Sequence, residues 1–139
     1  MYLVDTDVIS ELRKKDKANR GVTGFFHDAA ARDLPLYLAA VTVGELRRGV
    51  ELIRHRGDAI QARTLTRWLE RLLADYADQI LPFDGEAAQI WARLRVPHAE
   101  NPLDKQIAAT ALLYDLTLVT GNVRHFAPTG VRVFDPFAR

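Results

Sequence analysis

The chain contains no cysteine, and this absence excludes several kinds of chemistry. Without thiols there are no disulfides, no thiolate nucleophile and no zinc site built from cysteine. Any metal ion must therefore be held by oxygen or imidazole ligands. The lack of cysteine also fits a reducing compartment, and we expect the protein to be cytoplasmic.

Long apolar runs are absent as well. No stretch approaches the ~20 consecutive apolar residues that a membrane-spanning helix requires. The apolar residues at 2–4 are followed at once by Asp5, and no basic region precedes a long apolar segment as it would in an export signal. We therefore expect neither contact with a membrane nor secretion.

An excess of charge of one sign is also missing, because 19 Lys and Arg residues face 18 Asp and Glu residues, a net charge of +1. The charges are, however, separated along the chain. Segments 13–20 and 43–71 are rich in Lys and Arg, whereas segment 72–92 carries acids and no base. The basic segments suit a polyanion or an acidic partner, although solvent-exposed helix faces show the same pattern.

The chain has the length and composition of an ordinary globular domain. Its 139 residues fall near the usual size of one domain, roughly 100–150 residues. With 48% hydrophobic and 27% charged residues it can bury a sizeable core. We predict a single domain over residues 1–139.

Short apolar runs alternate with helix-like segments. Strands are predicted at 2–4, 36–40, 79–82, 117–120 and 131–134, and helices at 8–15, 18–32, 43–55, 59–76, 84–94 and 103–114. Apolar strands that alternate with helices indicate an α/β domain whose mainly parallel sheet is covered on both faces. The aromatic residues at helical spacing, Trp68, Tyr76 and Trp91, are expected in the core, with a stacking platform or a dimer interface as alternatives.

Three acidic residues lie at the junctions of predicted elements. Asp5 ends the first strand, Glu45 lies near the start of a helix, and Asp104 opens the helix after Pro102. Ligands of α/β sheets gather beyond the carboxyl ends of the strands, so the three carboxylates can meet there. Carboxylates packed together repel one another unless they bind a hard cation such as Mg²⁺ or Mn²⁺, and such a cation suits phosphodiester chemistry.

Each acid also has a purely structural interpretation. Asp5 and Asp7 can serve as helix caps, and Thr42 with Glu45 has the spacing of a capping box. Asp104 can simply complement the positive end of a helix dipole. Spacing alone leaves both interpretations open.

Four segments resemble, in order, the motifs of PIN-domain ribonucleases, and most closely those of the VapC and FitB type of toxin in type II toxin–antitoxin systems. They are VDTDVISEL at 4–12, TVGELRRG at 42–49, PLDKQIAATA at 102–111 and LVTGN at 118–122. The resemblance implies a three-layer α/β/α sandwich and Mg²⁺- or Mn²⁺-dependent cleavage of RNA. It also implies a homodimer and a VapB-like antitoxin that occludes the site in a higher assembly.

The resemblance assigns roles to particular residues. Asp5, Glu45 and Asp104 match the family's catalytic, metal-binding acids. Thr6 and Thr120 match small hydroxyl residues that orient Asp5 or the attacking water.

The chain departs from the family at its fourth acid. Family members often carry a carboxylate where this chain has Asn122 or His125, so the site is one acid short and a second metal ion is in doubt. Asp7 stands where the family commonly has Asn; it either restores part of the charge or caps the helix facing solvent.

Basic and imidazole side chains provide further candidates. Arg47 and Arg48, which follow Glu45, are predicted to contact RNA phosphates or acidic antitoxin side chains. A metal-free alternative is acid–base cleavage by histidines, for which only His98 and His125 lie on predicted loops.

Two functions from different classes follow from these observations. The first is a metal-dependent endoribonuclease acting as a toxin. The second is a non-catalytic, degenerate PIN module that binds an antitoxin or RNA without cleaving it. A phosphoacceptor receiver domain fits less well, because no acceptor Asp ends a middle strand with a Lys ending a later one.

Overall fold

The computed structural model describes residues 1–138 and forms an α/β fold around a parallel sheet. Within these residues the strands are β1 (Tyr2–Val4), β2 (Leu36–Ala39), β3 (Ile80–Leu81), β4 (Thr117–Val119) and β5 (Val133–Phe134). They lie in the order β3-β2-β1-β4-β5, and every neighbouring pair is parallel. All carboxyl ends of the strands therefore lie at one edge.

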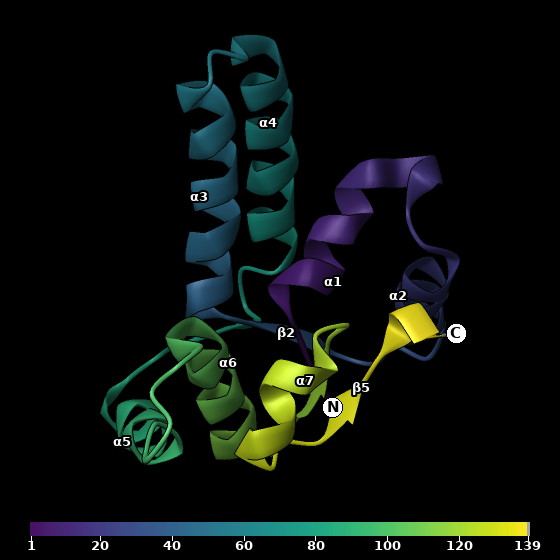
Figure 1. Cartoon of the computed structure of the whole chain (residues 1–139). Coiled ribbons are helices and arrows are strands. Elements are labelled where there is room, and N and C mark those ends of the chain that lie inside the picture. Colours follow the sequence, from purple (N-terminus) through teal and green to yellow (C-terminus); the bar gives the residue numbers. More distant parts are fainter. Residues whose placement is uncertain (139) are drawn as a thin grey trace.

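Helices connect the strands. They are α1 (Thr6–Glu11), α2 (Arg20–Ala31), α3 (Ala40–His55), α4 (Ala59–Asp75), α5 (Gly85–Leu94), α6 (Pro102–Leu113) and α7 (Val123–Phe126). Short 3₁₀ helices occur at Leu12–Lys17, Ala127–Thr129 and Pro136–Ala138. In Figure 1 the pair α3 and α4 extends away from the sheet, with α5 and α6 packed together at the other end.

The two faces of the sheet carry separate hydrophobic cores, because successive strand side chains point to opposite faces. Val4 and Val119 pack with residues of α1, α2, α3 and α4, whereas Leu3 and Leu118 pack with residues of α6 and α7. The predicted three-layer sandwich with a mainly parallel sheet is confirmed. No helix within residues 1–138 has the length and apolar character to cross a membrane.

Two predicted helix starts are wrong. The helix predicted at 8–15 begins at Thr6 and changes to a 3₁₀ helix at Leu12, because Asp5 acts as the N-cap. The helix predicted at 43–55 begins at Ala40, so Thr42 lies inside it. The short helix α7 was not predicted at all.

Two of the three aromatic side chains expected in the core, Trp68 and Tyr76, pack against it, whereas Trp91 belongs to neither core. Trp68 and Tyr76 pack, half-buried, against the core on the α3–α4 side of the sheet. Trp91 is also half-buried, and its indole Nε1 donates to the carbonyl of Pro102 at 2.9 Å. This bond ties α5 to the start of α6.

Candidate active site

Asp5 occupies the junction where β1 ends and α1 begins. Its carboxylate accepts hydrogen bonds from the Thr6 amide and the Thr120 hydroxyl, each at 2.7 Å. The residue is only 5% exposed. Burial, together with the neighbouring Asp7 carboxylate, raises its pKa to about 7. Asp5 therefore does cap α1. A helix cap alone, however, does not require its charged carboxylate to be buried so deeply.

Asp7 is held against the loop that follows β4. One carboxylate oxygen, Oδ2, accepts from the Gly121 amide at 2.9 Å. The other, Oδ1, is buried and finds no hydrogen-bond partner within residues 1–138. Burial raises the pKa of Asp7 as well. The interpretation of Asp7 as a solvent-facing helix cap is therefore wrong: the acid points inward, and half of its carboxylate lacks a donor.

Glu45 is positioned from α1 rather than by its own helix. Its Oε1 accepts from the Thr6 hydroxyl at 2.8 Å, and that hydroxyl lies 3.2 Å from the Thr42 hydroxyl. The capping-box interpretation is wrong, because α3 starts at Ala40 and its N-cap Ala39 makes no side-chain capping bond. Thr6 thus connects the two acids: its amide bonds Asp5 and its hydroxyl bonds Glu45.

Asp104 lies in the first turn of α6 and contacts the short helix α7. His125 Nδ1 is 2.8 Å from Asp104 Oδ2 and 2.7 Å from the Asn122 side-chain nitrogen. In one tautomer of His125, Nδ1 carries a proton and donates to Asp104. In the other tautomer, Nδ1 accepts a hydrogen bond from Asn122. His125 lies on α7 and not on a loop as predicted, so it is held against Asp104.

The acids share an electrostatic environment. Besides Asp7, the charge of Asp104 contributes to the raised pKa of Asp5. The donors are all oxygen atoms, one of them buried without a partner, so the donor chemistry fits a hard divalent cation. In the described part of the chain, no three His, Asp or Glu side chains are arranged to hold a metal ion. Glu45 bonds Thr6, and Asp104 contacts His125.

A cavity of about 190 Å³ adjoins Glu45. Thr6, Glu45 and Arg13 line it, so the fold brings one side chain of the basic segment 13–20 beside the acids. Arg47 and Arg48 do not line this cavity. Arg47 lies 3.8 Å from Glu51, and Arg48 is exposed on the surface of α3.

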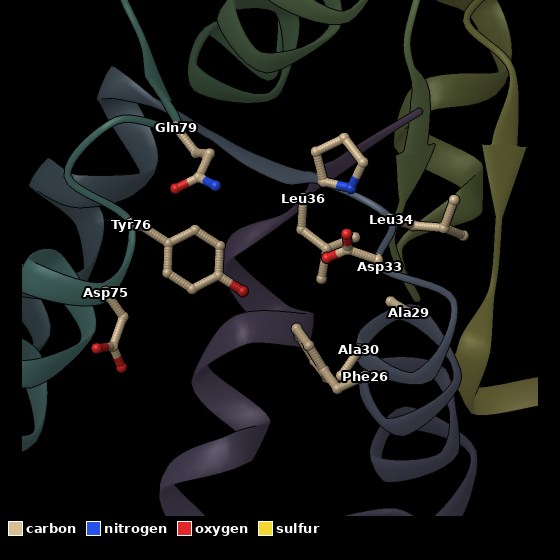
Figure 2. Close-up of a pocket in the computed structure, with 10 residues that line it drawn as sticks. Phe26, Ala29, Ala30, Asp33, Leu34, Leu36, Asp75, Tyr76 and Gln79 are labelled. Atoms are coloured by element: carbon tan, nitrogen blue, oxygen red, sulfur yellow. The ribbon is translucent and has the colours of Figure 1, made fainter.

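A larger cavity, of about 410 Å³, lies between α2, β2 and the end of α4 (Figure 2). Tyr76 and Gln79 line one side of it, and Phe26 and Asp33 line the other. Burial and the charge of Asp75 raise the pKa of the Tyr76 hydroxyl to about 12. None of the residues predicted for catalysis or for RNA contact lines this cavity.

The sequence did not predict two further hydrogen bonds around the acids and their partners. The Gly121 amide bonds Asp7, and the Thr42 hydroxyl contacts Thr6. Both residues lie within the recognised motifs, but hydrogen bonds between residues 36 and 114 positions apart leave no local signal. The sequence also did not predict the burial of Lys105, because it lies between two polar residues, Asp104 and Gln106, at the start of α6.

Comparison with known proteins identifies the family of this chain. A family model described as the PIN domain matches residues 2–130. Toxin FitB of Neisseria gonorrhoeae is 36% identical over 143 residues, which cover 99% of each chain. The VapC ribonuclease Y4jK of Sinorhizobium fredii is 32% identical over 144 residues, which cover 99% of this chain and 98% of that protein.

The fold is shared as well. The crystal structure of FitAcB from Neisseria gonorrhoeae superposes with a TM-score of 0.86 at 35% identity, and the match covers 100% of both chains. The chain therefore belongs to the PIN-domain family, among proteins similar to FitB and VapC.

Proposed function

We propose that this protein is a Mg²⁺- or Mn²⁺-dependent endoribonuclease that acts as the toxin of a toxin–antitoxin system. The observation that carries the proposal is the buried Asp5 carboxylate at the carboxyl edge of the sheet, with its pKa raised by burial and by other acids. A buried group of like charges is costly unless a cation compensates it. The relatives named toxin FitB and VapC ribonuclease support the reaction class.

Asp5, Glu45 and Asp104 are the side chains proposed to hold the cation, and the unpartnered Oδ1 of Asp7 is a further oxygen donor. A bound divalent cation supplies an activated water and neutralises charge on the phosphodiester. Asn122 offers an amide in place of the family's fourth carboxylate.

Other side chains of the chain set the orientation of these acids. The Thr120 hydroxyl fixes one oxygen of Asp5, and the Thr6 amide fixes the other. The Thr6 hydroxyl holds Glu45, and His125 holds Asp104. These contacts restrict the freedom of the carboxylates, which limits the entropy lost when a ligand binds. Binding of one cation by all three acids would need a further shift of the side chains, because no three acidic or imidazole side chains within residues 1–138 are arranged to hold a metal ion.

Cleavage of RNA by the purified protein tests the proposal. We expect cleavage with Mg²⁺ or Mn²⁺, its loss in excess chelator, and a loss of at least about 100-fold in Asp5→Asn and Asp104→Asn. The matched control is Asp78→Asn, an exposed acid after α4 that should leave the rate unchanged. Cleavage that persists in chelator, or in both variants, would overturn it. RNA binding without cleavage would instead indicate the non-catalytic module.

We also propose that an antitoxin partner and a second copy of the chain complete the assembly. The similarity to a chain of the FitAcB crystal structure supports this proposal. Light scattering of the protein alone should give the mass of a dimer. Expression of the chain alone should arrest bacterial growth, and expression of the cognate antitoxin should relieve the arrest.

Arg47 and Arg48 are proposed as contacts for RNA or for the antitoxin, and Arg13 joins them because it lines the cavity beside Glu45. Substitution of Arg47 and Arg48 together should weaken the binding of RNA or of the antitoxin. If neither affinity changes, this role is excluded.

A further inference from the structure

Lys105 is a buried cation without an anionic partner. The residue is 4% exposed, on the second turn of α6. Its ammonium donates to the carbonyl of His98, and within residues 1–138 it forms no ion pair with an acid. An ammonium group has three N–H donors, so one neutral acceptor leaves its charge and two donors unmatched. A buried charge normally requires an opposite charge, which points to an anion that binds here.

A cavity lies next to this ammonium. Its volume is about 340 Å³, and Lys105, Arg124, His98 and His125 line it, with Glu100 as the one acidic residue among the lining side chains. Four apolar side chains complete the wall: Leu94, Val96, Pro97 and Pro128. The lining thus combines cationic donors with an apolar surface, which suits a ligand that has both an anionic and a flat apolar part.

The start of α6 borders the same cavity. Asn101, which lines the cavity, is the N-cap of α6, but its side chain makes no capping hydrogen bond. The first residue of α6, Pro102, has no backbone N–H, and Asp104 places a carboxylate in the first turn. The attraction of the cavity for an anion therefore rests on the side chains of Lys105 and Arg124.

The cavity adjoins the acids of the proposed catalytic site. His125 lines the cavity, and the same imidazole contacts Asp104. A strand of RNA that crosses Asp104 presents further phosphates on either side of the cleaved bond, so one of them can reach the cavity.

We propose that this cavity is a nucleotide subsite, in which Lys105 and Arg124 bind the phosphate of an RNA nucleotide next to the cleaved bond. The inference rests on the proposed function and deepens it. An acidic side chain of a partner protein would also satisfy the cations. The apolar side chains in the same lining favour a nucleotide, because its base can lie against them while its phosphate meets the ammonium.

Binding of single-stranded RNA in excess chelator tests the subsite separately from cleavage. Lys105→Met keeps the length of the buried side chain and removes its charge, while Arg124→Ala removes an exposed cation of the same cavity. Fluorescence anisotropy should show binding weakened roughly five- to tenfold in each variant. The slope of log K against log salt should fall by about 0.7 for each lost phosphate contact.

The control is Arg71→Ala, an exposed arginine on α4 that should change neither the affinity nor the slope. Thermal unfolding verifies that Lys105→Met is folded; if it is not, Arg124→Ala decides the outcome. Unchanged RNA affinity in Arg124→Ala and in a folded Lys105→Met would overturn the subsite. If the variants bind the antitoxin more weakly but bind RNA as the wild type does, the nucleotide subsite is excluded. The cavity would then bind an acidic side chain of the antitoxin.

The same experiment keeps the two proposals apart. If the wild-type protein binds RNA through this cavity but cleaves none with Mg²⁺ or Mn²⁺, the subsite stands and the catalytic proposal fails. If cleavage occurs and both variants leave the RNA affinity and KM unchanged, the catalytic proposal stands and the subsite fails.

Discussion

At the scale of single residues, Asp5 and Glu45 are held by hydroxyl and amide donors rather than by cations. Asp5 accepts from Thr120 and from the Thr6 amide, and Glu45 accepts from the Thr6 hydroxyl. Neutral donors stabilise a carboxylate less than an arginine or lysine would. The arrangement therefore leaves the negative charge available to a cation, at some cost to the stability of the metal-free protein.

Asp5→Asn should stabilise the metal-free protein at neutral and alkaline pH. Burial and Asp7 raise the pKa of Asp5 from 3.8 to about 7, so between these values the unfolded chain has released a proton that the folded chain retains. The free energy of unfolding must then fall as the pH rises from about 4 to 7. We expect Asp5→Asn to raise the Tm at pH 8 by several degrees and to change it much less at pH 4.

Thermal unfolding in chelator at both pH values measures this difference. Asp78→Asn serves as the control, because that exposed acid should shift the Tm equally little at both values. An Asp5→Asn variant that is less stable than the wild type at pH 8 would show that its hydrogen bonds outweigh the buried charge.

Thr6→Val should impair cleavage more than stability. The substitution keeps the shape of the side chain but removes the hydroxyl that donates to Glu45 at 2.8 Å. A carboxylate freed from its donor is misplaced for catalysis, and we expect kcat for RNA to fall roughly 10- to 100-fold. Thr6→Ser should restore most of the rate, and both variants should unfold within about 1 kcal/mol of the wild type. Equal rates in Thr6→Val and Thr6→Ser would contradict this positioning role.

At the scale of elements, the turn between β4 and α7 connects three parts of the chain. Gly121 donates to Asp7 on α1, and the ring of Phe137 from the C-terminal 3₁₀ helix packs against it. A methyl group at position 121 would lie 2.6 Å from Phe137 Cδ2 and 3.0 Å from Asp7 Oδ2. Glycine is therefore required there by close approach.

Gly121→Ala should destabilise the protein by about 1–3 kcal/mol, because the added methyl group must displace Phe137 or Asp7. Gly44→Ala is a matched control: Gly44 lies on α3 with nothing within 4 Å of the added atom. That substitution should stabilise by about 0.5–1 kcal/mol, since alanine favours a helix. Urea unfolding of both variants measures the contrast, and similar midpoints would refute the close-packing argument.

At the scale of the whole molecule, the last residues complete the sheet and its core. The PIN-domain match covers residues 2–130, but β5 pairs with β4 beyond that limit. Phe134 and Phe137 pack against the core that contains Val4 and Val119. Residues 131–138 are therefore structural members of the fold.

A chain shortened to residues 1–130 should be less stable by roughly 3–5 kcal/mol. It loses the burial of two phenylalanine side chains, each worth about 1.5–3 kcal/mol, and exposes the edge of β4. Urea unfolding followed by circular dichroism measures the loss, with a chain that lacks only Arg139 as the control. An unchanged midpoint would show that β5 and the following 3₁₀ helix contribute little.

Much of the fold could be predicted from the sequence. The apolar runs at 2–4, 36–40 and 117–120 gave the central strands, because buried parallel strands must be apolar on both faces. Helix starts were predicted less well near Asp5 and Thr42, where residues that can cap a helix also belong to the family motifs. The structure begins these helices at Thr6 and Ala40. The helix α7 has only four residues, too few for a periodic pattern.

The sequence by itself determined the parallel sheet and the family motifs, and it predicted the candidate acids within those motifs. Only the tertiary structure decided which donors hold Asp5 and Glu45, that Asp7 points inward, and that Lys105 is buried beside a cavity. Local patterns specify strands and helices through periodicity and capping. Burial, pKa and long-range hydrogen bonds depend instead on packing between segments that lie far apart in the chain.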